Sequence, residues 1–479
     1  NICGGGHLAA IVFCCDPRKK RCPFRDYALK LLGIDKEKFI EVKEGLKVEA
    51  PGTCFGNLAY CVTGDTKVLL KDGELREIKE IVENEEKVEV LSFDDELRVV
   101  PKRVTHFWKI PSPKTLIHIR TRSGRELTIT PDNEVPILRK GRVVWVPAGK
   151  LREGDFMLAP LRYQGEELGL DPSELLDKRR LYRNVTYPRL FLYETEKPGY
   201  ATPIRLPRAL TPDILYIHGL VSADGSNDGR TVYLTNVEEI LHTMLRKTLK
   251  EYFNINVHTY KSSNSRTLIS TANNKALAEL FSKLSHKLLL LPKELVRAWM
   301  AGVIDGDGYV ANSRIEIAAG SRDFAYTVLV ASLRLGLYAY LRKVSRRESI
   351  IDGRVITPRR DGYWYVHFAK TDELLRELKE IAKYVVLEKK RRRLEQLTSK
   401  KPRYSFMDVI PISDYLRENK AYLSAKEYAD YVCRGERPSR MYLRRSKLMS
   451  LDTVRKLVNS DVFFDEVVEV RRVDSKEPY

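Results

Sequence analysis

Cysteine is the first residue type in this 479-residue chain whose spacing suggests chemistry. Six of the seven cysteines fall within the first 61 residues: Cys3, Cys14, Cys15, Cys22, Cys54 and Cys61. Such clustering indicates a metal or redox site in a reducing compartment, not a disulfide framework. The adjacent Cys14 and Cys15 match no standard zinc spacing. Two interpretations stay open for the first five: ligation of zinc or an iron–sulfur cluster, or buried inert thiols.

The cysteine-rich segment also contains an imperfect internal repeat. The stretch "CGGGHLAAIVFCC" (3–15) and the stretch "CFGNLAYC" (54–61) share a cysteine, a following glycine, a Leu-Ala pair and a closing cysteine. The segment "CCDPRKKRCPFRDYALKLLGI" resembles a small cysteine-repeat family of methanogens and their relatives, which implies an archaeal source. We therefore predict that residues 1–60 are a host-protein fragment whose second repeat is interrupted at Cys61.

Two Asp-Gly motifs lie far downstream, "IHGLVSADG" (217–225) and "MAGVIDGDG" (300–308). Each follows an apolar, helix-like run and precedes a strand-like run. A single Asp-Gly at a helix end is usually a cap and a turn. Two copies at repeat spacing resemble the LAGLIDADG motif of single-chain homing endonucleases, from which the first copy departs at His218 and Ser222.

The resemblance implies a metal-dependent nuclease site. In that fold, Gly219 and Gly302 allow two helices to approach closely, so that Asp224 and Asp307, 83 residues apart in sequence, meet at their ends. Mg²⁺ between the two carboxylates would offset their repulsion and activate water for phosphodiester hydrolysis.

Related enzymes place a lysine near each acidic pair. The candidates are Lys287 and, in "LEKKRRRL", Lys389 or Lys390, of which we favour Lys390. The family position three residues before Pro292 is occupied here by Leu289, which leaves the assignment of Lys287 open. A solvated surface lysine is the alternative for each.

The resemblance further implies two curved sheets that read base edges in the major groove of DNA. The candidate readers are Arg342, Lys343, Arg346, Arg347, Arg354, Arg359 and Arg360. They are interleaved with Tyr363, Trp364 and Tyr365, about half of which we expect in the core. Lys389, Arg391, Arg392 and Arg393 are expected to bind phosphates.

The stretch "CVTGDTKVLL", which begins at Cys61, resembles the start of a self-splicing intein with its Hint domain. The resemblance implies that the Cys61 thiol attacks the carbonyl of Tyr60 and exchanges an amide for a thioester, which a downstream residue then attacks. Without this role Cys61 would be an ordinary loop thiol.

A second splicing motif, normally Thr-x-x-His, matches "TITPDNEVPIL" with Thr130 and, in the histidine place, Asn133. Asparagine can hydrogen-bond the scissile amide but cannot act as an acid near neutral pH, so we expect a slow or temperature-dependent first step. An Asx-turn is the alternative role. The terminal His-Asn pair is not found up to Tyr479, so we expect the chain to be cut from a longer product whose next segment begins with Cys.

These motifs require a multidomain fold. Short β runs separated by turns predict an all-β domain over 61–165, which the resemblance implies is of the Hint type. A connector or a DNA-facing extension is expected to follow over 166–210. A repeated order of helix, strand, strand, helix predicts a duplicated α/β unit over 211–385, which the resemblance implies is an αββαββα endonuclease. Residues 386–460 are expected to form a basic helical DNA-binding or linker region, and 461–479 to start the C-terminal Hint part.

Bulk composition agrees with a nucleic-acid partner. The chain carries 84 Lys and Arg against 65 Asp and Glu, a net charge of +19, which attracts phosphate backbones. Glutamine occurs only twice while charged residues abound, which points to a thermophile. No apolar run approaches about 18 residues, and no signal peptide opens the chain.

We therefore expect a cytoplasmic monomer with an internal pseudo-two-fold that cuts both strands of the intein-less host gene. Two alternatives remain: a degenerate endonuclease that only binds DNA, and a self-cleaving element in a host metalloprotein.

Overall fold

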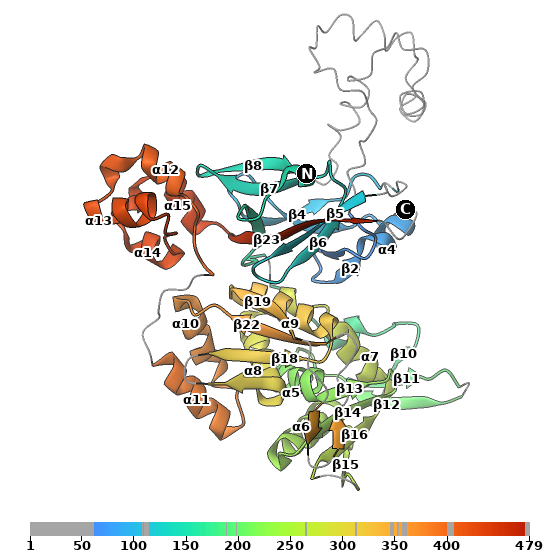
Figure 1. The fold of residues 1–479 in the computed structure, drawn as a ribbon. Helices are drawn as coiled ribbons and strands as arrows, with labels where there is room; N and C mark the ends of the chain where they lie inside the picture. The colour runs from blue at the N-terminus through green and yellow to red at the C-terminus, as the bar shows by residue number, and fades with distance from the viewer. Residues whose placement is uncertain are drawn as a thin grey trace, which may run out of the picture.

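The computed structural model describes residues 62–107, 109, 115–165, 167–187, 189–197, 199–263, 266–311, 314–344, 349–351, 354–356, 362–399 and 407–474. Cys61 and the predicted host segment 1–60, with its candidate metal ligands, lie outside these ranges. Figure 1 shows a β body (residues 62–165 and 407–474) above an inserted unit (residues 167–399).

The β body is built from both ends of the chain. Its elements before the insertion are β1 (Lys67–Leu69), β2 (Leu75–Glu77), α4 (Ile78–Glu83), β3 (Glu89–Phe93), β4 (Val99–Arg103), β5 (Thr115–Thr121), β6 (Glu126–Ile129), β7 (Glu134–Arg139), β8 (Arg142–Pro147), η1 (Ala148–Lys150) and β9 (Phe156–Pro160). The main sheet has the order β6-β5-β23-β9-β7-β8. The late strand β23 (Val462–Asp474) pairs with β9 through its first half and with β5 through its second half. The strand predicted near the end of the described chain therefore lies at the centre of this sheet.

The segment predicted as a connector is folded. It contains η2 (Pro172–Leu175), β10 (Leu181–Arg183), β11 (Leu190–Glu194) and β12 (Ala201–Arg205), which pair in that order as an antiparallel sheet. Phe191, Tyr193 and Ile204 are buried against the core of the inserted unit, whereas Leu192 is exposed. Alternate burial along β11 and β12 makes this segment part of the unit, not a link between domains.

The inserted unit shows the predicted duplication. Its first half contains α5 (Pro212–Asp224), β13 (Gly225–Asn227), β14 (Thr231–Asn236), α6 (Glu239–Phe253), β15 (His258–Lys261), β16 (Leu268–Asn273) and α7 (Lys275–Leu284). After η3 (Leu288–Leu290), its second half contains α8 (Lys293–Asp307), β17 (Gly308–Val310), β18 (Ile315–Ala319), α9 (Arg322–Leu335), β19 (Ala339–Val344), β20 (Ser349–Ile351), β21 (Arg354–Ile356), β22 (Tyr363–Phe368) and α10 (Asp372–Ile381). The sheet orders β13-β14-β16-β15 and β17-β18-β22-β19 are equivalent, and the β20–β21 hairpin is added to the second half.

The predicted basic helical region divides between the two bodies. Helix α11 (Glu388–Thr398) buries Leu394 and Leu397 in the core of the inserted unit. The segments α12 (Ser413–Glu418), η4 (Lys420–Tyr422), α13 (Ala425–Glu427), η5 (Tyr428–Cys433), α14 (Arg440–Arg445), η6 (Lys447–Ser450) and α15 (Asp452–Asn459) belong to the β body. Leu443 and Leu457 share a buried cluster with Phe156.

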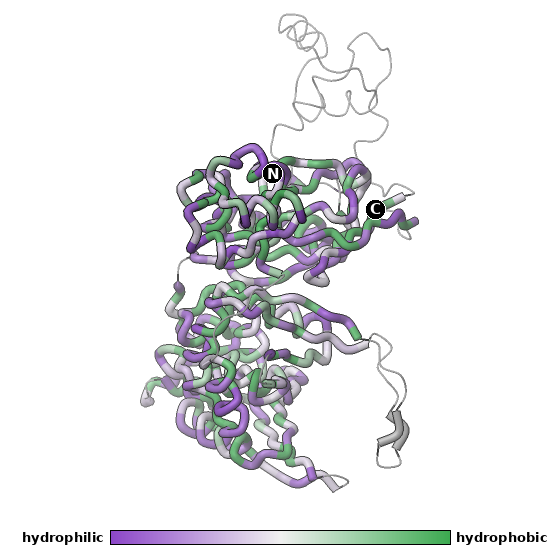
Figure 2. The backbone as a smooth tube through the Cα atoms, turned by 60° about the vertical axis from the view of Figure 1, so that its left-hand side comes forward, coloured by the Kyte–Doolittle hydropathy of each residue, from purple (hydrophilic) through white to green (hydrophobic). Residues whose placement is uncertain are grey.

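One arginine of this helical region has a structural role. Arg440 is 3% exposed and donates to the carbonyls of Leu457, Val458 and Val462 and to Asp408. A buried guanidinium with this many acceptors anchors the helices to β23. Hydrophobic and hydrophilic stretches alternate along the backbone of both bodies (Figure 2).

None of the helices within the described ranges has the length and apolar character needed to cross a membrane.

Candidate active sites

The two motif helices, α5 and α8, pack against each other at the centre of the inserted unit (Figure 1). A Cβ atom at Gly219 would lie 2.0 Å from the carbonyl oxygen of Trp299, and one at Gly302 would lie 2.0 Å from that of Tyr216. Both distances are far inside van der Waals contact, so only glycine fits at these positions. The predicted close approach of the two helices is therefore present.

The helices end side by side at Asp224 and Asp307. A Cβ atom at Gly306, one residue before Asp307, would lie 2.7 Å from Ala223 Cβ and 3.3 Å from Asp224 Oδ2. Asn236 Nδ2 donates to Asp224 Oδ2 at 2.6 Å and fixes the orientation of that carboxylate. The structure thus brings together the two carboxylates that the sequence motifs single out.

The electrostatics of this pair favour a bound cation. Burial raises the pKa of Asp224, against the hydrogen bond from Asn236 and the charge of Lys390. Burial also raises the pKa of Asp307 to about 7, with the charge of Asp224 acting in the same direction and that of Lys390 opposing it. Two partly buried carboxylates cannot both ionise at low cost unless a positive charge lies between them.

The donor set of the pair suits a hard divalent ion. Within the described ranges, no cluster of three or more His, Cys, Asp or Glu side chains is placed to hold a metal. Oxygen ligands beyond the two carboxylates would come from backbone carbonyls, water and substrate phosphate, which is how proteins usually bind Mg²⁺.

Of the candidate lysines, the structure brings Lys390 to the carboxylate pair. Its Nζ donates to the carbonyl oxygens of Ile304 (2.8 Å), Asp305 (2.8 Å) and Gly306 (3.0 Å), and so caps the C-terminal end of α8. Burial lowers the pKa of Lys390, an effect that the charges of Asp305, Asp224 and Asp307 oppose. All three ammonium protons have carbonyl acceptors, which makes this lysine a support for the helix end.

Lys287 lies elsewhere, contrary to the sequence-based assignment. Its Nζ is 2.8 Å from Asp72 Oδ2, in the turn between β1 and β2 of the β body. The residue follows α7 on the side of the unit that faces the β body, so its position is set by contact between the two bodies.

A third carboxylate, Asp305, was missed by sequence analysis. It is 1% exposed and accepts hydrogen bonds from the Tyr216 hydroxyl (2.7 Å) and from the backbone N–H groups of Val386 (2.7 Å) and Leu387 (3.3 Å). It therefore ties α8 to α5 and to the start of α11, the helix that carries Lys390. In the sequence, Asp305 is visible as the first acid of "IDGD" (304–307) in the second motif.

The first motif has no equivalent of this tie. At the corresponding position, Ser222 Oγ donates to the carbonyl of His218 in its own helix. Burial lowers the pKa of His218 to about 4, and its Nε2 is 2.9 Å from the carbonyl oxygen of Phe281. His218 is thus a neutral core residue, and the two halves of the site differ.

Two of the predicted base readers lie on β19. Arg342 is exposed opposite Tyr365 of β22, and Lys343 is exposed opposite Trp364. Trp364 is 8% exposed, with Lys343 5.5 Å from its ring centroid, whereas Tyr363 and Tyr365 are partly exposed. The expectation that some of these aromatics are core is met by Trp364. Arg346, Arg347, Arg359 and Arg360 lie outside the described residues, and Arg354 is placed only as a backbone position of β21.

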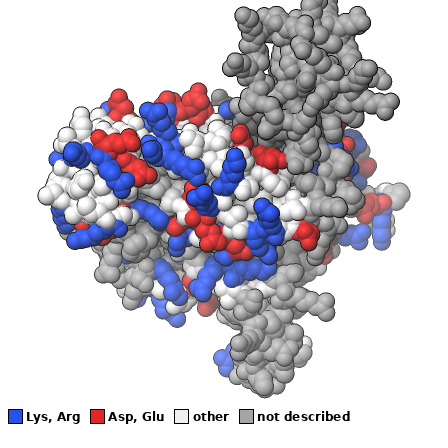
Figure 3. All heavy atoms as spheres, turned by 45° about the horizontal axis from the view of Figure 1, so that its top comes forward, with Lys and Arg blue, Asp and Glu red and all other residues white. Residues whose placement is uncertain are grey.

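The predicted phosphate-binding residues lie on α11. Lys389 and Arg393 line a groove of about 510 Å³ with Lys390 and Tyr309, beside the end of α8. Arg392 pairs with Glu388, and Arg391 is partly exposed. On the face drawn in Figure 3, by contrast, Lys and Arg are interspersed with Asp and Glu and form no single-sign surface.

Two of the candidate splicing residues, Thr130 and Asn133, share one turn of the β body. Val62 forms an antiparallel bridge with Ile129, which holds the first described residues beside Thr130. Thr130 is 2% exposed, and its carbonyl accepts from the N–H of Asn133 at 3.1 Å. The carbonyl of Asn133 in turn accepts from Ala148 N–H at 2.8 Å, so Asn133 is part of a tight turn.

A histidine near this turn was also missed. His118 of β5 lies opposite Thr128 of β6, and its Nδ1 is 3.1 Å from Thr128 Oγ1. The N–H of Thr63 donates to the carbonyl of the same Thr128 at 3.1 Å. Because His118 reaches this place from a neighbouring strand, no local motif could have identified it.

The β body is assembled from both ends of the described chain, and this turn lies beside its first residues, as the sequence resemblance leads one to expect. A family model described as "Intein splicing domain" matches residues 68–479, and the chain belongs to this family.

Similar curated proteins carry unrelated names. One component of the A-type ATP synthase of Pyrococcus abyssi is 25% identical over 91% of this chain and 42% of its own length. The reverse gyrase of Pyrococcus horikoshii is 26% identical over 59% of this chain and 17% of its own length. The chain therefore spans less than half the length of these relatives.

Similar solved structures each match less than half of the chain. The PabCDC21-1 intein is 28% identical over 21% of this chain and 73% of its own, with a TM-score of 0.21. The endonuclease I-DmoI in complex with DNA and Mn is 14% identical over 37% of this chain and 97% of its own, with a TM-score of 0.28.

Proposed function

We propose that this intein carries a site-specific DNA endonuclease as its inserted unit, and that the unit hydrolyses phosphodiester bonds in both strands with a divalent cation. The observation that carries the proposal is the meeting of Asp224 and Asp307 at the ends of two glycine-packed helices. A partly buried carboxylate pair of this kind is costly, and such pairs cluster at functional sites.

The residues of the site would have distinct roles. Asp224 and Asp307 would hold the cation, which supplies an activated water for attack on phosphorus. Asn236 orients Asp224, Lys390 fixes the end of α8, and Asp305 holds α11 against both motif helices. Asp305 and Lys390 are thus positioning residues in this proposal.

DNA would lie across the two matching sheets. Lys389, Lys390 and Arg393 of α11 line a groove beside the end of α8. Arg342 and Lys343 are exposed on β19, at the edge of the second of these sheets, opposite β17. Side chains on sheets would contact base edges, whereas the α11 cations would contact phosphates. The proposed partner is double-stranded DNA of the uninterrupted host gene, bound by one copy of the chain through its internal pseudo-two-fold.

The same intein would begin splicing at Cys61. The shared segment occurs in relatives whose names are otherwise unrelated, as expected of an element inserted into different hosts. The Cys61 thiol would attack the Tyr60 carbonyl carbon, with the amide nitrogen of Cys61 taking up a proton as the thioester forms. Thr130 and Asn133 would hydrogen-bond the scissile peptide.

A binding-only role is the second candidate, because the two halves differ. Ser222 replaces an acid in the first motif, Lys287 is paired with Asp72, and the Lys390 protons are taken by carbonyls. If these differences disable catalysis, the unit would still bind DNA through its charge.

Metal removal separates the two candidates. A plasmid that carries the uninterrupted host gene is incubated with the protein, with Mg²⁺ and then with excess EDTA. We expect linear plasmid with Mg²⁺ only, because without a cation between Asp224 and Asp307 no water would be activated for attack on phosphorus. A plasmid that lacks the host gene serves as control. Bound but uncut plasmid in Mg²⁺ would show the unit to be a binding module.

A further inference from the structure

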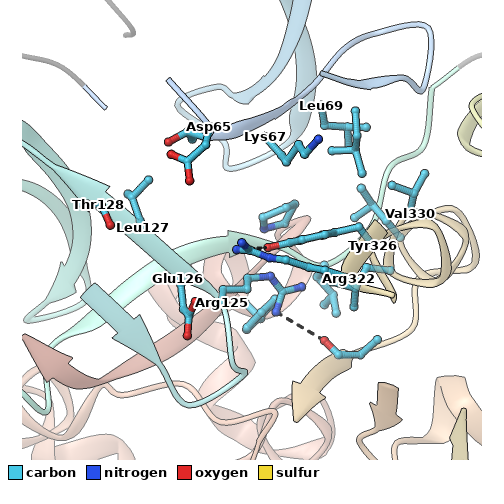
Figure 4. Close-up of a pocket in the computed structure, with 18 of the residues that line it drawn as sticks. Asp65, Lys67, Leu69, Arg125, Glu126, Leu127, Thr128, Arg322, Tyr326 and Val330 are labelled. Atoms are coloured by element: carbon cyan, nitrogen blue, oxygen red, sulfur yellow. Dashed lines mark hydrogen bonds between the residues drawn. The ribbon is translucent and has the colours of Figure 1, made fainter. Parts of the chain in front are cut away.

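The β body docks on the open edge of a sheet in the inserted unit. Within the described ranges, strand β19 is the last strand of its sheet, so its outer backbone groups have no neighbouring strand. The N–H of Leu341 on this edge donates to the carbonyl of Ser123 at 2.7 Å, and Arg125 Nη1 donates to the carbonyl of Ala339 at 3.5 Å. Figure 4 shows Arg125 reaching from the β body toward the inserted unit.

The turn that makes this contact depends on a glycine. Gly124, between β5 and β6, has φ +77° and donates to the carbonyl of Thr121 at 2.9 Å. A Cβ atom at Gly124 would lie 2.1 Å from the carbonyl oxygen of Leu341. Any larger residue would therefore push the two bodies apart at this edge.

The turn is also fixed within the β body. Asp465 of β23, which is 1% exposed, accepts from the N–H of Ser123 at 3.0 Å and from its hydroxyl. Arg125 Nη1 donates to Ser123 Oγ at 2.6 Å, and Arg125 Cζ lies 5.0 Å from the ring centroid of Phe463. A buried carboxylate with these donors makes the turn rigid.

The docked turn leads directly to the candidate splicing residues. Strand β6 begins at Glu126, pairs with β5, forms the Val62–Ile129 bridge and ends beside Thr130. One end of β6 is thus held by the inserted unit, and the other end is bridged to Val62, the residue after the proposed nucleophile. Displacement of such a strand by a fraction of an ångström is enough to lower the rate of a step that depends on alignment.

We propose that Ser123 and Gly124, docked on the β19 edge, are positioning residues for the first splicing step. The inserted unit would then take part in splicing by holding β6 in place, a role called the brace below. This inference rests on the proposed role of Cys61. Arg342 and Lys343 directly follow Leu341 on β19, so the same strand would carry both the brace and the DNA contacts.

The test compares two glycine substitutions in the full chain. Gly124→Ala and Gly154→Ala place the same methyl group at similar backbone angles, φ +77° and +88°, but Gly154 has nothing within 4 Å of the added atom. The rate of thiol-induced cleavage at the Tyr60–Cys61 bond is measured well below both melting temperatures. We expect Gly124→Ala to be slower than Gly154→Ala by about 10-fold or more.

A second pair of substitutions tests the same contact in case the Gly124→Ala protein does not fold. Arg125→Met removes the hydrogen bonds to Ser123 and Ala339, whereas Arg122→Met alters an exposed arginine of the same turn that pairs with Glu466. We expect cleavage by Arg125→Met to be about 3-fold slower than by Arg122→Met. Equal cleavage rates within both pairs of variants would overturn the proposed brace role.

Cys61→Ala separates failure of the brace from failure of the proposed function. If Cys61→Ala abolishes cleavage while the matched variants cleave at equal rates, only the brace is wrong. If Cys61→Ala still cleaves, the proposed splicing start is wrong, and the brace loses its basis.

Discussion

Replacing Asp307 with asparagine is expected to lower the rate of plasmid cleavage in Mg²⁺ by about 100-fold or more. The asparagine side chain would keep the size of the aspartate but would carry no negative charge, so the pair could no longer hold a divalent cation through two carboxylates. The measurement is the appearance of linear plasmid over time at saturating protein. DNA binding, followed by gel shift, should remain because the basic residues of α11 and β19 are unchanged.

Asp213→Asn is the matched control for this substitution. Asp213 lies in the first turn of α5, at the end of the helix away from Asp224, and accepts a surface hydrogen bond from Tyr252 at 3.2 Å. Loss of its charge should leave the cleavage rate within about 2-fold of wild type. Equal cleavage by wild type and Asp307→Asn would show that the nuclease reaction, if present, does not use this carboxylate.

Replacing Cys61 with alanine is expected to abolish thiol-induced cleavage between Tyr60 and residue 61. Alanine has no nucleophile, so the amide cannot be exchanged for the thioester that an external thiol would attack. Release of the 60-residue segment is followed by mass spectrometry after incubation with dithiothreitol. We expect release from wild type and none from Cys61→Ala.

Cys433→Ala controls for a general effect of cysteine loss. Cys433 is a free, exposed thiol in the helical region of the β body. Its replacement should not change the cleavage rate. Cleavage that depends on Cys433 and not on Cys61 would contradict the assignment of the splice junction.

The sequence was most informative where a local motif has one geometric solution. Gly219 and Gly302 recur at the same place in two motifs, and in the structure each fits under a backbone carbonyl of the other helix. The alternation of helix and strand predicted the duplicated unit because each half repeats the same order of elements. Asp224 and Asp307 followed from their place at the ends of those helices.

The sequence was least informative where position depends on contacts between distant segments. Lys287 and Lys390 looked alike as basic residues near the second motif, but one pairs with Asp72 of the β body and the other caps α8. His118 contacts Thr128, two residues before the turn at Thr130, from the neighbouring strand β5. Asp465 reaches the β5–β6 turn from the late strand β23. No spacing within one segment contains this information.

The folded segment over residues 166–210 shows a different limit of prediction from sequence. Its proline and arginine content is typical of a linker, yet Phe191, Tyr193 and Ile204 are buried in the unit beside it. Strands of three to five residues give too short an alternation to be distinguished from chance. Their burial becomes visible only against the helices that cover them.

Anomalous scattering from crystals of the protein with Mn²⁺ would test the central claim most directly, because it locates the ion itself. A single cation site shared by both motif helices predicts a peak about 2 Å from one carboxylate oxygen of Asp224 and one of Asp307. A map with no peak there, or with these two carboxylates turned into separate surroundings, would contradict the nuclease assignment.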